Sequence, residues 1–155
     1  MLKADRNHIF LVIFCKGVRF IRYEQGVLTD RSSKFAYSQE LARQVAVNGA
    51  DGIVTIGEIW QSEAVVDEDS VPIPPAEVPD RREALEVAAE DRYGNRRVKL
   101  CFFRKRFNRI GFEEEVEFGQ DVENNFMAPV RAVWKHRDES EGDAGTSEGP
   151  LTPPT

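Results

Sequence analysis

Apolar and charged residues alternate in three consecutive segments, and this alternation limits the possible folds more than any other feature of the chain. The segments are 83–91, 96–103 and 111–118, with a turn at residues 92–95. A period of two places successive side chains on opposite faces of a strand. Short turns between such strands are typical of antiparallel pairing, so the pattern predicts a β-meander with one covered face.

Two helices are expected to complete the domain. Segment 33–48 repeats Tyr37, Leu41 and Val45 at helical spacing, and Ser32 or Ser33 is expected to cap its start. A second helix is expected to begin near Pro129, because proline suits the first turn of a helix and apolar residues follow at positions 130, 133 and 134. We expect both helices to pack on the meander.

Two further segments are expected to form secondary structure. Segment 52–64 is apolar on both faces at its start, which predicts a central strand. Segment 9–23 is rich in β-branched and aromatic residues, so it fits two strands broken near residues 16–17. It also fits one buried helix, and periodicity leaves both alternatives open.

The sequence therefore predicts an α+β fold, an antiparallel meander of about four strands with helices packed on one face. Residues 1–135 are expected to form a single domain. Residues 136–155 hold one apolar residue larger than alanine, Leu151, among glycine, proline, serine, threonine and acids. Such a segment buries too little surface to offset the entropy of ordering, so we expect a disordered acidic tail.

The residues that most enzyme and metal sites require are scarce. Cys15 and Cys101 are the only cysteines, and His8 and His136 the only histidines. No zinc-ligand pair, Ser-His-Asp order or glycine-rich phosphate loop is present, so no cofactor or metal is expected and no enzyme class is indicated. Both cysteines lie in apolar runs, which fits free thiols in a cytoplasmic protein. The apolar run 9–15 is too short for a membrane span.

Glu58 is the first candidate catalytic residue, because it lies in an otherwise apolar stretch of the expected central strand. A buried carboxyl group has a raised pKa and can act as a general acid or base, here with Asp80 or Glu63. The alternative is structural: Glu58 reaches solvent past Trp60 or pairs with an arginine, for which the candidates are Arg81, Arg82 and Arg97. Asp80 is also expected to accept backbone hydrogen bonds where the next strand begins.

Segment 92–109 is the second candidate site, because it carries eight basic residues and no acidic one, interleaved with aromatics. This combination can bind phosphates and stack on bases. However, segments 83–91 and 111–123 hold four and six acidic residues, so cross-strand pairing is expected to neutralise most of the basic strand. Three residues are expected at the hairpin tip, outside this pairing, as the anion contact: Arg104, Lys105 and Arg106.

Three segments together resemble a family of uncharacterised bacterial proteins. They are 49–60, with Glu58-Ile59-Trp60; 78–91, with Pro79-Asp80-Arg81-Arg82-Glu83-Ala84-Leu85; and 124–134. The resemblance covers residues 35–134. It implies a small α+β fold and a bacterial, cytoplasmic origin. It supplies no catalytic residue, because the family has no established activity.

Three functions follow from these features. The first is a non-enzymatic accessory or protein-interaction module that binds a protein partner or a second copy, with the acidic tail and the proline-rich segment 66–83 as further contacts. The second is binding of nucleic acid or a phosphate ligand through 92–109, and the third is a carboxylate-dependent enzyme using Glu58. An interaction module needs an exposed apolar patch or an uncovered sheet face.

Overall fold

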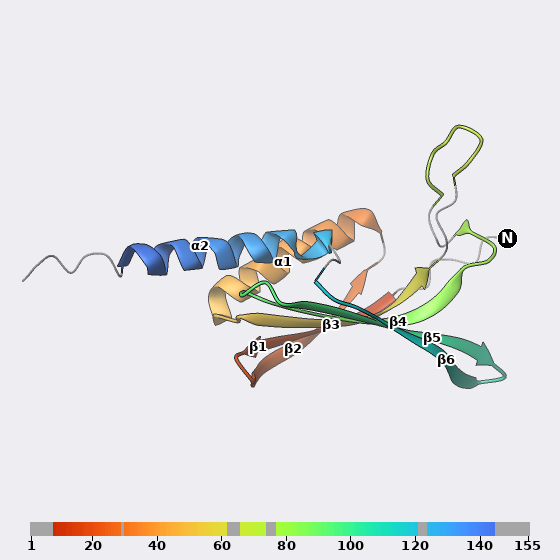
Figure 1. Ribbon diagram of the computed structural model, residues 1–155, viewed down its shortest axis with the longest axis horizontal. Coiled ribbons are helices and arrows are strands. Elements are labelled where there is room, and N and C mark those ends of the chain that lie inside the picture. Colours follow the sequence, from red (N-terminus) through yellow and green to blue (C-terminus); the bar gives the residue numbers. More distant parts are fainter. Residues whose placement is uncertain (1–7, 29, 62–65, 74–76, 121–123, 145–155) are drawn as a thin grey trace, which may run out of the picture.

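Six antiparallel strands form one sheet, and two helices lie on one of its faces (Figure 1). The computed structural model describes residues 8–28, 30–61, 66–73, 77–120 and 124–144. The strands are β1 (His8–Lys16), β2 (Arg19–Leu28), β3 (Gly52–Gln61), β4 (Arg82–Asp91), β5 (Arg96–Arg106) and β6 (Arg109–Phe118), in the spatial order β2-β1-β3-β4-β5-β6. The helices are α1 (Arg31–Asn48) and α2 (Ala128–Ala144), the latter preceded by the short 3-10 helix η2 (Asn125–Met127). The expected α+β class is confirmed, with six strands in the sheet rather than four.

The ambiguous N-terminal segment is a β-hairpin. β1 pairs with β2 around a two-residue turn in which Gly17 has φ 58°, a conformation that glycine adopts without a steric cost. β1 also pairs with β3, so the hairpin extends the sheet beyond the meander. β3 therefore lies inside the sheet, as its apolar sequence predicts.

The first helix begins earlier than predicted, because its cap is Asp30 rather than a serine. The Asp30 carboxylate accepts a hydrogen bond from the Ser33 backbone at 2.7 Å, and the Ser33 hydroxyl contacts the Asp30 backbone N–H at 3.0 Å. This reciprocal capping box satisfies two donors that the helix itself leaves unpaired. The helix ends at Gly49, which has φ 72°.

The C-terminal helix is longer than predicted and corrects the boundary drawn at residue 136. Residues 136–144 belong to α2. Contacts outside the helix explain this: Arg92, in the β4–β5 turn, pairs with Asp138 and with Glu141, and Arg137 donates to three backbone carbonyl groups. Residues 145–155 of the expected tail lie outside the described residues.

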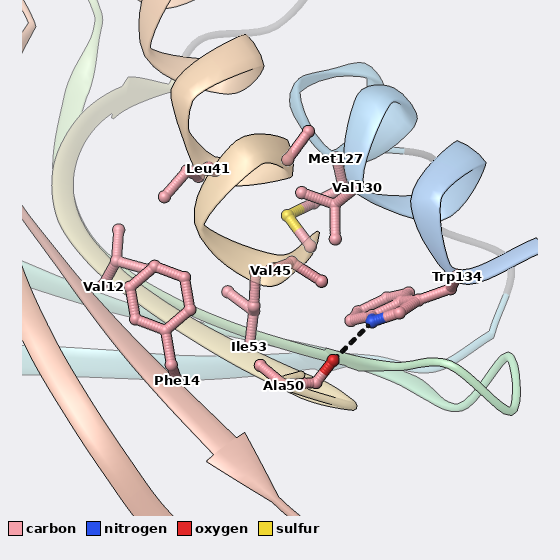
Figure 2. Packing of buried hydrophobic residues seen from close by; sticks show 10 residues of the cluster. Val12, Phe14, Leu41, Val45, Ala50, Ile53, Met127, Val130 and Trp134 are labelled. Atoms are coloured by element: carbon pink, nitrogen blue, oxygen red, sulfur yellow. Dashed lines mark hydrogen bonds between the residues drawn. The ribbon is translucent and has the colours of Figure 1, made fainter. Parts of the chain in front are cut away.

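The main core fills the space between α1, α2 and the strands β1 and β3 (Figure 2). Phe14, Leu41, Ile53 and Val130 are almost fully buried there. Trp134 closes the core, and its indole N–H donates to the Ala50 carbonyl at 2.9 Å. A smaller cluster, formed by Ala84, Ala88, Val98, Leu100 and Phe102, continues the covered face across β4 and β5.

The register shows which row of β4 lies under the helices. Ala84 and Ala88 pair with Phe102 and Val98, so they share the covered face with Glu86. The apolar row of β4, which is Leu85, Val87 and Ala89, points to the opposite face. The large apolar residues of β4 therefore do not contribute to either buried cluster.

Gly26 in β2 allows Tyr37 of α1 to lie against the sheet, and we predict that Gly26→Ala destabilises the fold. A β-carbon there would lie 2.9 Å from the Tyr37 ring. That ring is fixed by contacts with Phe10 and Phe126 and by a hydrogen bond to Glu24. The free energy of unfolding should fall by about 1–3 kcal/mol in urea denaturation.

Gly111→Ala in β6 is the matched control, because a β-carbon there meets no atom within 4 Å. It should leave stability unchanged or slightly higher. Equal losses in the two variants would contradict this account of Tyr37 packing.

Candidate functional site

An apolar band crosses the sheet face that lies opposite the helices, and we call it the open face. Cross-strand pairs place the band's side chains on one side: Leu11 with Ile56, Ile13 with Val54, Ile56 with Val87, Val54 with Ala89, and Leu85 with Cys101. All of these residues, and Cys15, are partly exposed. Neither described helix covers them (Figure 1). The band is therefore a continuous apolar surface across four strands.

The two margins of the open face differ in character. At the β2 edge the exposed rings of Phe20 and Tyr23 lie 6.3 Å apart. At the opposite margin, oppositely charged side chains pair between β5 and β6: Arg97 with Glu117 at 3.4 Å, Lys99 with Glu115 at 2.9 Å and Arg104 with Glu113 at 2.8 Å. The expected cross-strand pairing of the basic strand is thus confirmed. The open face combines an uncharged centre with a charge-balanced margin.

The hairpin turn lies further along the chain than predicted. Arg104, Lys105 and Arg106 belong to β5, and the turn residues are Phe107 and Asn108. Arg104 is paired with Glu113, and Lys105 lies 3.8 Å from Glu58 and 3.9 Å from Glu83. The prediction that all three side chains stand outside the ion pairs is therefore wrong for Arg104 and Lys105.

Residues 106–109, which we call the hairpin tip, retain the unpaired charge. Arg106 and Arg109 face each other across the turn, and neither forms an ion pair with another described residue. Phe107 is fully exposed, at 101%, and has φ 44°, while Asn108 has φ 64°. Asparagine tolerates this left-handed region, whereas a bulky residue is strained there by about 1–2 kcal/mol. The tip therefore presents a strained, solvated aromatic ring between two free guanidinium groups.

The two carboxylates predicted from the sequence occupy different kinds of position. Glu58 lies at the border of the open face, with half of its side chain exposed and Lys105 as its partner, so the buried environment expected for it is absent. Asp80 is exposed in the segment before β4 and accepts no hydrogen bond from another described residue. Glu63 lies outside the described residues. Catalysis by Glu58 or Asp80 stays a prediction.

The arginines expected to pair with Glu58 have other partners. Arg81 lies over the Trp60 ring, with 4.5 Å between the guanidinium carbon and the ring centroid. Arg82 lies over Phe102 at 3.9 Å and pairs with Glu114 at 3.0 Å. These contacts join the start of β4 to β3, β5 and β6, so the cations stabilise the sheet rather than a carboxylate in a cleft.

One ion-pair cluster was not predicted from the sequence. Glu90 of β4 is 8% exposed and lies between Arg96 of β5, at 3.3 Å, and Arg131 of α2, whose Nη2 donates at 3.0 Å. Arg131 also donates to the Asn124 carbonyl at 2.9 Å. The cluster links α2 to the sheet. The part of this cluster that the sequence could have indicated is the Glu90–Arg96 pair, because the predicted turn at 92–95 makes these two residues cross-strand neighbours.

The described residues include one open cleft large enough for a small molecule, about 510 Å³ at the end of the sheet beside Cys15, Asp91 and Arg97. It is largely open to solvent. Within these same residues, no group of three histidine, cysteine or carboxylate side chains is placed to hold a metal ion. Neither α1 nor α2 is long and apolar enough to cross a membrane.

Glu86 is partly buried on the covered face, and burial raises its pKa, while Lys34 of α1 lowers it to a smaller extent. A raised pKa in the folded state means that the charged form is the one that folding disfavours. The native state is therefore most favoured below the ordinary carboxyl pKa and loses stability as pH rises through the raised value.

We predict that Glu86→Gln stabilises the protein at neutral pH by about 1 kcal/mol, because the variant has no charge to bury. The gain should shrink towards about pH 4, where Glu86 itself is protonated. Urea denaturation of both proteins at each pH measures this difference. The exposed Glu68→Gln is the control, and a gain independent of pH would contradict the assignment.

We also predict that Phe107→Asn stabilises the fold by about 1 kcal/mol, because it relieves the left-handed strain and removes no packing. Thermal and urea denaturation measure the change. Ile110→Asn is the control, since Ile110 is also exposed but has no positive φ, and it should not stabilise. A loss of stability in Phe107→Asn would show that the ring packs on the fold.

Comparison with known proteins places the chain in a family. Neither the curated proteins nor the solved structures give a match. A family model described as bacteriophage lambda protein ea47 matches residues 1–146, a range that includes all the strands, both helices, the open face and the hairpin tip. The resemblance predicted from the sequence was to a family of uncharacterised bacterial proteins over residues 35–134. The family that matches is described as a phage family, and its match covers a longer part of the chain. This chain belongs to the bacteriophage lambda protein ea47 family.

Proposed function

We propose that the chain is a non-enzymatic interaction module that self-associates through its open face. The observation that carries this proposal is the apolar band, which lies opposite both helices and contributes to neither buried cluster. Burial of apolar surface is the main favourable term in most protein association. A band of this extent on an otherwise charged domain is typical of an interface.

The charge pattern favours a second copy as the partner. The centre of the open face is uncharged, and the margin residues Arg97, Lys99 and Arg104 are already paired within the chain. Two such faces bring no unpaired like charges together at these positions. A two-fold axis uses the same patch on both copies, which is the commonest arrangement among soluble oligomers.

The size of the face also suits a dimer. Six strands of about ten residues span roughly 30 Å by 30 Å, about 900 Å², at ordinary strand spacings. A stable interface buries about 800 Å² on each partner. Two sheets packed face to face lie about 10 Å apart, which leaves the helices on the two outer surfaces.

A cytoplasmic site of action fits this interface. Cys15 and Cys101 are free thiols and both lie on the open face. Thiols persist in the reducing cytoplasm, and there the proposed interface would hold them as small apolar groups.

The test is the mass in solution, measured by sedimentation over a range of protein concentrations up to about 100 µM, since dimerisation depends on concentration. We predict twice the 17.6 kDa chain mass for the wild type and the monomer mass for Val87→Lys, which places a charge in the apolar band. Ile56→Gln, a milder change, should weaken the dimer if Val87→Lys does not fold.

Val18→Lys is the matched control, because Val18 is fully exposed at the β1–β2 turn and the substitution adds the same charge. It should remain a dimer. A monomeric wild type at the highest concentration rejects self-association, and a dimeric Val87→Lys shows that another surface forms the contact.

A further inference from the structure

We propose that the hairpin tip binds duplex DNA, with the Phe107 ring entering the minor groove and Arg106 and Arg109 contacting the phosphates on either side. This inference goes beyond self-association and does not rest on it. The tip lies at the end of the long β5–β6 hairpin, away from both helices (Figure 1).

Phe107 carries the first part of the argument. Its ring is fully exposed, it takes part in none of the described aromatic contacts, and its backbone has a positive φ. The residue therefore adds strain to the fold without adding packing. Strain held at an exposed position is characteristic of sites that meet a ligand, and an apolar side chain between base steps is a recurrent device of minor-groove proteins.

The two arginines carry the second part. Arg106 and Arg109 are direct cross-strand partners, so their Cα atoms are about 5.5 Å apart. Like charges placed opposite each other destabilise a hairpin, and no described carboxylate offsets them. The nearby Arg104 and Lys99, by contrast, are each paired with a glutamate. Along this hairpin, the unpaired charge is thus confined to the two residues that flank the Phe107-Asn108 turn.

The geometry fits a duplex groove. The minor groove is about 6 Å wide with a phosphate chain on each side, so the proposal inserts only the Phe107 ring and leaves the hairpin backbone outside the groove. Arg106 and Arg109 lie on the two strands on either side of the turn, so the proposal assigns one arginine to the phosphates of each strand of the duplex. The remaining basic residues of β5 are neutralised, so the contact is limited to the tip.

Duplex DNA fits the tip better than a membrane surface does. The exposed apolar side chains at this end of the hairpin are Phe107, Ile110 and Phe112. The carboxylates of Glu58, Glu83 and Glu113 lie close behind them. Membrane insertion of the tip would bring these carboxylates against anionic headgroups. A groove contact involves the four tip residues and leaves the glutamates in solvent.

The whole chain carries a net charge of −6, so we expect weak, salt-sensitive binding. The experiment measures fluorescence anisotropy of a labelled duplex of about 20 base pairs at about 50 mM salt and above. The wild type should bind in the micromolar range. Phe107→Asn should weaken binding by about fivefold or more with an unchanged salt slope, and Arg106→Gln should lower the salt slope by about one unit.

Arg19→Gln is the matched control, because it removes one exposed positive charge from the other two-residue hairpin, at the opposite end of the sheet (Figure 1). In the proposed complex Arg19 contacts no phosphate. The affinity of Arg19→Gln should therefore stay within about twofold of the wild type, and its salt slope should not change, because only the loss of a phosphate contact lowers that slope. Circular dichroism and melting temperature verify that every variant is folded. Phe107→Asn is informative here, because this variant should bind the duplex more weakly and yet have a higher melting temperature than the wild type.

Four results would overturn the proposal. They are absence of duplex binding at about 50 mM salt, equal weakening by Arg19→Gln and Arg106→Gln, full binding by Phe107→Asn, and binding only to phosphatidylcholine–phosphatidylserine vesicles in a sedimentation assay with no binding to the duplex. The last result would assign the tip to an anionic membrane surface. None of them changes the sedimentation mass that tests self-association, so the two proposals fail independently.

Discussion

The contact between α2 and the turn that joins α1 to β3 holds the helical layer on the sheet. Trp134 donates to the Ala50 carbonyl, and Arg137 donates to the carbonyls of Val45, Gly49 and Ala50. The last carbonyl groups of a helix lack partners within that helix. Trp134 and Arg137 therefore bind carbonyl groups at the end of α1 and in the turn that follows it, and they fix α2 there, in a region where Ala50 is fully buried.

The links between α2 and the sheet lie at one end of the sheet. The other links between α2 and the strands, through Glu90 and Arg92, lie at the same end of the sheet, where β4 ends and β5 begins. The hairpin tip lies at the opposite end. Because both helices pack on one face and the links of α2 to the strands lie at one end, the open face and the tip are left free of the packing that stabilises the fold.

The sequence predicts most of the strands because period-two alternation is a local property, and residues 82–118 form β4, β5 and β6 as expected. It does not predict which face of β4 is covered, because both faces carry apolar residues, and only the pairing of Ala84 with Phe102 decides it. The extent of α2 was missed for a similar reason. Its polar sequence gives no signal, and Arg137 and Asp138 are ordered by partners that lie far away in the chain.

The candidate site divides in the same way. Pairing along β5 and β6 follows from the sequence, because a basic strand next to an acidic one in a hairpin has few other partners. The position of the turn does not, since neither Phe107 nor Asn108 is the glycine that marks such turns. A shift of the turn by a few residues decides which cations stay unpaired. The burial predicted for Glu58 fails because an apolar stretch on both faces does not require that both faces are covered.

The distribution of charge along this hairpin separates stability from recognition. Near the sheet, each cation that approaches a carboxylate strengthens pairing by at most about 1 kcal/mol, because these pairs are exposed. At the tip, Arg106 and Arg109 repel each other and Phe107 is strained, so all three residues work against the turn that they form. A fold selected for stability alone would place Asn-Gly or a paired charge there. The cost is tolerable because the cores on the covered face do not include the tip, and residues outside the core are where binding can be altered without unfolding the protein.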